Sequence, residues 1–167
     1  QVRAPLDQAA LRRALARPGG MWRAPEVVER TGSTNADLLA RARARAGEPE
    51  GAVLAAEEQR AGRGRMGRTW TSPPRAALMV SVLLKPAVPP ARRGWLPLLA
   101  GVAVATAVTQ VAGVETRIKW PNDLLAAMTR PAEAGGAKLG GILVETRSGP
   151  GRIAAVIGVG LNCRRTP

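Results

Sequence analysis

The residues best suited to chemistry form one short stretch, from Gln59 to Trp70. Its sequence is QRAGRGRMGRTW. Within it, from Gly62 to Arg68, three glycines alternate with three arginines. Glycine lets backbone N–H groups turn towards an anion at torsion angles that other residues avoid. Arginine adds a planar, permanently charged fork of hydrogen-bond donors. The stretch is therefore predicted to wrap a phosphate or a carboxylate.

The segment Gly62–Gly67 also matches the Gly-x-Gly-x-x-Gly pattern of dinucleotide-binding folds. In those folds the glycines open a helix. Here the following residues, 68–74, read RTWTSPP and cannot continue as a helix. A dinucleotide-binding fold is disfavoured for this reason, and the stretch taken alone is equally compatible with a flexible basic loop.

Lysine is rare in this chain, since three of the 25 basic residues are lysines. Lys138 directly precedes the apolar run Leu139–Val144, which makes its ammonium a candidate for a functional charge. The alternative is a lysine at a strand end, where lysine often protects a sheet edge. Two other polar clusters have equally plain alternatives: Ser33-Thr34-Asn35 as a helix N-cap, and Pro121-Asn122-Asp123 as a turn.

Composition narrows the class of protein. The net charge of +13 invites a nucleic-acid interpretation, but the arginines are spread along the chain and the sequence has no Tyr or Phe for base stacking. A basic, solvated surface is favoured, and no DNA partner is expected. The single cysteine, Cys163, cannot form an internal disulfide, and the N-terminal residues 1–10 lack a signal-peptide core. These features favour a cytoplasmic location.

The segment Gly94–Val114 has no charged residue and is long enough to suggest a membrane span. It contains Pro97, Gly101 and Gln110, and its apolar content is largely alanine and valine. We expect a helix buried against a sheet, and no membrane partner.

The elements that must position these residues follow from hydrophobic periodicity and turn signals. Helices are predicted at Leu6–Ala16, from Ala36 to Gly47, and at Gly94–Val114. Strands are predicted at Glu26–Arg30, Gly51–Glu57, Ala76–Leu84, Glu115–Trp120, Asp123–Ala127, Lys138–Thr146 and Arg152–Asn162. The arginine–glycine stretch is thus held between two strands. Because hairpins join several strands, we predict one α+β domain over residues 1–167, with a mixed, mostly antiparallel sheet covered by helices.

Five motifs follow one another in the order of a known family. They are STN at 33–35, GRGR at 62–65, KWPND at 119–123, KLGGILVE at 138–145 and GVGLN at 158–162. Together they resemble the catalytic domain of biotin protein ligases over roughly residues 26–163. The resemblance implies a class II aminoacyl-tRNA synthetase-like or biotin synthetase-like fold.

The resemblance also implies an activity. Enzymes of this family join biotin to ATP, which gives biotinyl-5'-AMP and pyrophosphate, and then transfer biotin to one lysine of a biotin carboxyl carrier protein or domain. Magnesium is expected to arrive with the nucleotide, and no protein metal site is expected. A monomer and a weak homodimer both stay open.

The roles implied for single residues fall into three groups. The residues expected to bind biotin are Ser33, Thr34, Asn35, Gln59, Arg63, Gly64, Arg65, Lys138 and Gly141. Those expected to bind ATP or the adenylate are Arg63, Arg65, Arg68, Trp70, Asn122, Lys138 and Asn162. Lys138, Arg65 and Asp123 are expected to be catalytic, with Lys138 meeting both the biotin carboxyl and the α-phosphate.

Two alternatives and two differences from the family accompany this hypothesis. The same fold serves lipoate or octanoate ligases and transferases, and the chain could also be an idle module that binds biotin or nucleic acid. The catalytic region begins by about residue 26, so the N-terminal helix-turn-helix of some members is expected to be absent. The small C-terminal β domain of most members is likewise expected to be missing.

Overall fold

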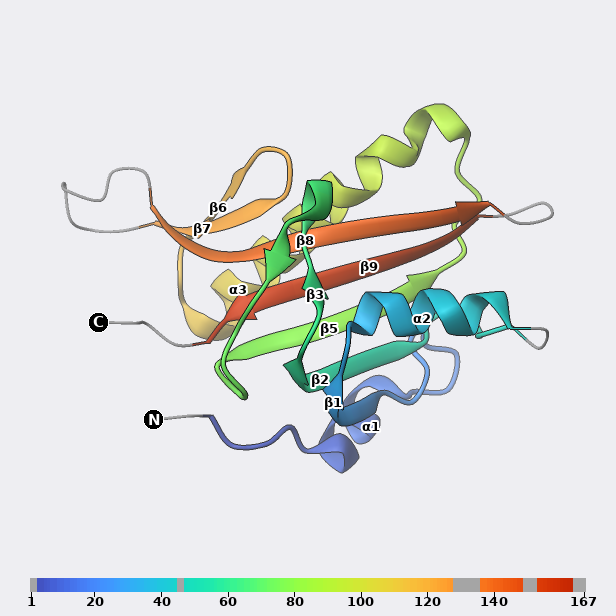
Figure 1. The fold of residues 1–167 in the computed structure, drawn as a ribbon, viewed down its shortest axis with the longest axis horizontal. Coiled ribbons are helices and arrows are strands. Elements are labelled where there is room, and N and C mark those ends of the chain that lie inside the picture. Colours follow the sequence, from blue (N-terminus) through green and yellow to red (C-terminus); the bar gives the residue numbers. More distant parts are fainter. Residues whose placement is uncertain (1–2, 45–46, 128–135, 149–152, 164–167) are drawn as a thin grey trace.

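The computed structural model describes residues 3–44, 47–127, 136–148 and 153–163. A seven-stranded sheet in the order β1-β2-β5-β9-β8-β7-β6 organises these residues (Figure 1). The strands span Glu26–Thr31 (β1), Val53–Gln59 (β2), Ala77–Leu84 (β5), Thr116–Lys119 (β6), Asp123–Ala126 (β7), Ala137–Ser148 (β8) and Ile153–Asn162 (β9). β1 and β2 run parallel, and the other neighbouring pairs run antiparallel. The predicted mixed, mostly antiparallel α+β fold is confirmed.

Helix α2 (Thr34–Arg43) covers one face of the sheet over β2, β5 and β9. Its apolar stripe places Leu38 and Leu39 against Leu54, Leu83 and Val156 in a closed core cluster. The helix begins where Ser33 Oγ accepts a hydrogen bond from the N–H of Ala36, as an N-cap residue does. The position of this cap puts the N-terminal turn of α2 at the centre of the sheet.

Helix α3 (Leu96–Ala112) lies behind the sheet, over β6, β7 and β8 (Figure 1). Side chains alternate along a strand, so on β5 Leu83 faces α2 while Val82 and Leu84 pack with the cluster under α3. Leu124, Ile142 and Ile157 are the buried members of that second cluster.

The prediction that this helix is buried is correct for one side only. Leu96 and Gly101 are its buried residues, whereas Leu99 and Val111 are 60% and 89% exposed. With the preceding 3-10 turn (Pro90–Trp95) it is long and apolar enough to cross a membrane by length and composition alone. That is weak support for a span, because apolar helices of soluble proteins satisfy the same criterion. The helix is apolar on all sides, but only one side of it packs against the sheet.

Helix α1 (Gln8–Leu15) lies beside β1 at the edge of the sheet, within the predicted range of residues 6–16 (Figure 1). The segment before it is fixed by Glu57 of β2, which accepts a hydrogen bond of 2.6 Å from the N–H of Leu6 and pairs with Arg3 at 2.5 Å. Burial raises the pKa of Glu57, but the hydrogen bonds from Arg3 and Leu6 lower it by more, so the net pKa is below the ordinary value.

The arginine–glycine stretch lies between β2 and β5, as predicted, and it forms a small hairpin, which was not predicted. It comprises β3 (Gly62–Arg63), a 3-10 turn (Arg65–Gly67) and β4 (Thr69–Trp70), which pair as a second small sheet. At Gly62 a Cβ atom would stand 2.4 Å from the carbonyl oxygen of Trp70, so the hairpin requires glycine there.

The predicted hairpin near the end of the chain is also present, because β7 and β8 pair antiparallel with an irregularity between Leu124 and Leu125. Most of its predicted long tip, residues 128–135, lies outside the described residues.

Candidate active site

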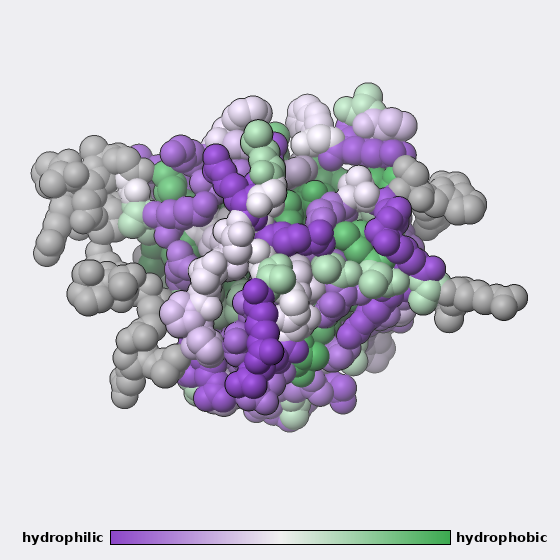
Figure 2. All heavy atoms as spheres, viewed as in Figure 1, coloured by the Kyte–Doolittle hydropathy of each residue, from purple (hydrophilic) through white to green (hydrophobic). Residues whose placement is uncertain are grey.

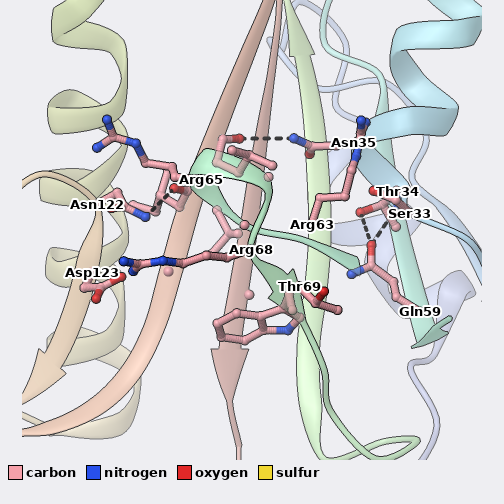
Figure 3. Close-up of a pocket in the computed structure, with 18 of the residues that line it drawn as sticks. Ser33, Thr34, Asn35, Gln59, Arg63, Arg65, Arg68, Thr69, Asn122 and Asp123 are labelled. Atoms are coloured by element: carbon pink, nitrogen blue, oxygen red, sulfur yellow. Dashed lines mark hydrogen bonds between the residues drawn. The ribbon is translucent and has the colours of Figure 1, made fainter. Parts of the chain in front are cut away.

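A pocket opens between the start of α2, the arginine–glycine hairpin and the strands β8 and β9 (Figure 3). The hairpin lies in front of the sheet and forms its outer wall (Figure 1). The lining residues are Ser33, Thr34, Asn35, Gln59, Arg63, Gly64, Arg65, Arg68, Thr69, Trp70, Asn122, Asp123, Lys138, Gly141, Ile142, Leu143, Gly158, Val159 and Gly160. Segments more than 100 residues apart in the sequence therefore meet in a single cavity.

The closed end of the pocket is polar and buried. Thr34 and Asn35 are 3% and 4% exposed. Gln59 Oε1 accepts a hydrogen bond from the N–H of Thr34 at 2.8 Å, and the Thr34 hydroxyl oxygen lies 3.0 Å from the same atom. The Asn35 amide donates to the carbonyl of Leu143 at 3.2 Å and to Glu145 Oε2 at 3.0 Å. The three-residue cluster thus starts α2 and also lines the pocket. The N-cap alternative is confirmed, and a role in binding biotin stays a prediction.

Two glycines of β9 shape the floor of the pocket. A Cβ atom at Gly158 would stand 2.2 Å from Asn35 Oδ1, and one at Gly160 would stand 2.7 Å from the indole ring of Trp70. Both distances are shorter than a real Cβ contact allows. Only glycine therefore lets the Asn35 amide and the Trp70 ring lie directly on the strand.

Trp70 separates the floor from the open end. Its ring lies over Gly160, and the ammonium of Lys138 is 5.9 Å from the ring centroid, within range of a cation–π interaction. Among the described residues, no acceptor partners the buried Trp70 Nε1. Trp70 is therefore a wall of the cavity, and not only a packing residue of the hairpin.

The open end carries most of the charge. Its basic residues are Arg63, Arg65, Arg68 and Lys138, against one carboxylate, Asp123. Lys138 Nζ donates to Asp123 Oδ1 at 2.9 Å, while Asn122 Nδ2 donates to the carbonyl of Ile142 at 3.2 Å. Figure 2 shows strongly hydrophilic residues gathered over this face of the molecule. The positive excess favours an anionic ligand.

Arg63 is held by Glu145 of β8, the carboxylate that also accepts a hydrogen bond from Asn35. The distance from Arg63 Nη2 to each Glu145 carboxylate oxygen is 3.3 Å. Arg65 and Arg68 are exposed on the 3-10 turn and just after it. All three arginines are exposed side chains of one hairpin (Figure 3).

The structure brings together every predicted site residue except Asn162. Asn162 is exposed at the end of β9, where its amide donates to the carbonyl of Lys138 at 3.3 Å, and it does not line the pocket. This contact is one that an asparagine capping a strand end makes, and a role near the adenylate stays a prediction. The roles assigned to the other residues are likewise predictions.

Sequence reasoning missed Ser81 and Glu145. Ser81 is fully buried and hydrogen-bonded to Thr34 and Asn35. The carboxylate of Glu145 accepts hydrogen bonds from Asn35 and Arg63. A lone serine within the apolar run Ala76–Leu84 was the available signal for the first. Glu145 belongs to a motif that was recognised, but the sequence does not show which neighbours it contacts.

Among the described residues, no group of three or more Asp, Glu, Cys or His side chains is arranged to hold a metal ion.

Comparison with known proteins places these features in a family. A model of the "Biotin/lipoate A/B protein ligase family" matches residues 27–162. A Mycobacterium tuberculosis protein named "Biotin--[acetyl-CoA-carboxylase] ligase" is 46% identical over 100% of this chain and 59% of its own length. The "Bifunctional ligase/repressor BirA" of Bacillus subtilis is 40% identical over 71% of this chain and 34% of its own length.

Solved structures agree with this placement. The crystal structure of biotin protein ligase from Leishmania major in complex with biotinyl-5-AMP aligns with a TM-score of 0.64 and 30% identity, over 86% of this chain and 58% of that one. The chain therefore spans less than two thirds of the length of these relatives. Since the family model covers most of the sequence, the chain belongs to the biotin/lipoate A/B protein ligase family.

Proposed function

We propose that the pocket binds biotin and ATP, forms biotinyl-5'-AMP, and passes biotin to a lysine of a carrier protein. The observation that carries the proposal is the division of a single cavity into a buried, hydrogen-bonding end and a cationic end. Biotin has the matching division, with a cyclic urea at one end and a carboxylate at the other. The names of the relatives from Mycobacterium tuberculosis and Leishmania major support the same ligand.

The first step would join two anions. A biotin carboxylate oxygen attacks the α-phosphorus of ATP, the bond to the β-phosphate oxygen breaks, and pyrophosphate leaves. Charge repulsion dominates the barrier, so fixed cations and N–H donors lower it by electrostatic preorganisation. Lys138, Arg63 and Arg65 line the open end, where the carboxylate would meet the phosphate.

The second step would transfer the acyl group. The amine of the acceptor lysine attacks the biotinyl carbonyl, the carbon–oxygen bond to AMP breaks, and AMP leaves. Asp123 is the one carboxylate among the lining residues, and it would accept the proton that the amine loses. Lys138 would stabilise the negative charge on the departing phosphate.

The remaining components follow from the donor set. Asp123 is already paired with Lys138, so the lining residues do not form a cage for a metal. Mg²⁺ is therefore expected to arrive bound to the ATP phosphates. We expect a biotin carboxyl carrier domain as acceptor, no DNA partner for this segment, and a cytoplasmic location.

The alternative substrate is lipoate or octanoate, which the family description includes. Isotope exchange of pyrophosphate into ATP distinguishes the candidates, because exchange requires reversible adenylation of the substrate. The proposal predicts exchange with biotin and none with lipoate or octanoate. Exchange that follows lipoate or octanoate would overturn the biotin assignment, and a chain that binds biotin without any exchange would be an idle module.

A further inference from the structure

One hydroxyl interrupts the apolar side chains of β5. Ser81 lies between Val80 and Val82 and is 0% exposed. Its Oγ is 2.7 Å from the hydroxyl of Thr34 and 2.6 Å from Asn35 Oδ1. Ser81 does not line the pocket, but it joins two side chains that do.

The hydrogen bonds that link Thr34, Ser81 and Asn35 can run in only two consistent directions. A serine hydroxyl has one proton. If Ser81 donates to Asn35 Oδ1, then Thr34 must donate to Ser81. If the Asn35 amide were turned over, its NH₂ would donate to Ser81, Ser81 to Thr34, and Thr34 to Gln59. The orientation of one amide therefore sets the direction of the whole chain.

Two acceptors on β8 fix that amide. Asn35 Nδ2 faces the carbonyl oxygen of Leu143 and the carboxylate of Glu145, neither of which can donate a proton. Glu145 in turn is held by Arg63, which balances its charge. The NH₂ group of Asn35 must then point to β8 and its oxygen to Ser81.

We propose that Ser81 and Glu145 are positioning residues that set this direction and thereby the ligand specificity of the pocket. In the direction observed, Asn35 Oδ1 and Thr34 Oγ keep lone pairs that can accept from a ligand. The buried end then selects a ligand with N–H donors, such as the two ureido N–H groups of biotin. This inference rests on the proposed function.

The test measures biotin binding by calorimetry for the wild type, Ser81→Ala, Glu145→Gln and the double variant. Each single change weakens biotin binding by about three- to tenfold, the scale of one hydrogen bond. Because both substitutions act through Asn35, biotin affinity should fall in the double variant by less than the product of the two single fold-changes. Val80→Ala and Glu29→Gln are the controls, since Val80 faces the other side of the sheet and Glu29 is exposed on β1. Both controls should bind biotin as the wild type does.

A second measurement separates positioning from general structural damage. Biotin methylated at either ureido nitrogen lacks one N–H donor, so the preference for biotin over these compounds should narrow in both variants. If Ser81→Ala does not fold, Ser81→Cys fills the site with a slightly larger thiol that is a weaker donor, and the preference for biotin over the methylated compounds should narrow in the same way.

Wild-type protein that binds no biotin would overturn the proposed function itself. If the wild type binds biotin and the variants match it in biotin affinity and in preference over the methylated compounds, this inference alone is overturned. It is also overturned if the fold-change in the double variant equals the product of the two single fold-changes.

Discussion

Lys138 and Asp123 form an ion pair of 2.9 Å between neighbouring strands at the open end of the pocket. Both side chains are partly exposed, so their attraction alone contributes little stability. The pair instead holds the ammonium beside the ring of Trp70. In the proposed reaction an anionic ligand would draw Lys138 away and leave Asp123 free to accept a proton.

Replacement of Lys138 tests whether its charge serves the adenylation step. Lys138→Met keeps the length of the side chain and removes its charge, so biotin-dependent pyrophosphate exchange should fall by about 100-fold or more. Asp123→Asn should slow transfer to an amine more than it slows exchange. Lys85→Met, at the far end of β5, is the control. Unchanged exchange in Lys138→Met would remove Lys138 from the chemistry.

The floor of the pocket should not tolerate a methyl group. In Gly158→Ala the new Cβ must displace the Asn35 amide, so biotin affinity should fall by about tenfold or more. Gly160→Ala should instead displace Trp70 and weaken ATP binding more than biotin binding. Gly94→Ala, where nothing lies within 4 Å of the new atom, is the matched control. Equal effects of the two floor variants on both ligands would argue against a divided pocket.

Acid should loosen the N-terminal segment. The net pKa of Glu57 is lowered in the folded chain, so as pH falls the unfolded chain binds the proton first. The stabilisation is complete at neutral pH and is lost as pH falls from about 4.3 through the lower folded-state pKa.

Unfolding free energies across this pH range should therefore decline less steeply in Glu57→Gln than in the wild type. At pH 7 this variant should be less stable by about 1–3 kcal/mol. Glu26, whose pKa is lowered chiefly by its hydrogen bond from Arg41, titrates in the same range in both proteins. Parallel curves for the wild type and Glu57→Gln would contradict the role of Glu57.

The two sides of α3 should differ in their sensitivity to truncation. Leu124 is fully buried in the cluster beneath the helix, so Leu124→Ala should cost about 2–5 kcal/mol in thermal unfolding. Val111 is 89% exposed, and Val111→Ala should change stability by about 0.5 kcal/mol or less. Similar losses in the two variants would mean that the outer side of α3 is covered in solution.

The outcome for α3 illustrates what the sequence could predict. Helix and strand positions follow from local periodicity, so the sheet and its helices were predicted within a few residues. A helix that is apolar all round does not reveal which side meets the sheet, so the prediction of a helix buried against the sheet holds for one side of α3 only. The pocket residues were found because five motifs occur in the order of a known family. The positions of Ser81 and Glu145 in the site depend on contacts between segments that are distant in the sequence, which no motif shows.

The most direct test of the central claim is mass spectrometry of the small molecules formed when the chain is mixed with biotin, ATP and Mg²⁺. The account predicts a species with the mass of biotinyl-5'-AMP that appears with the wild type and is lost in Lys138→Met. An adenylate formed only with lipoate or octanoate, or no adenylate from a folded chain that binds biotin and ATP, would contradict it.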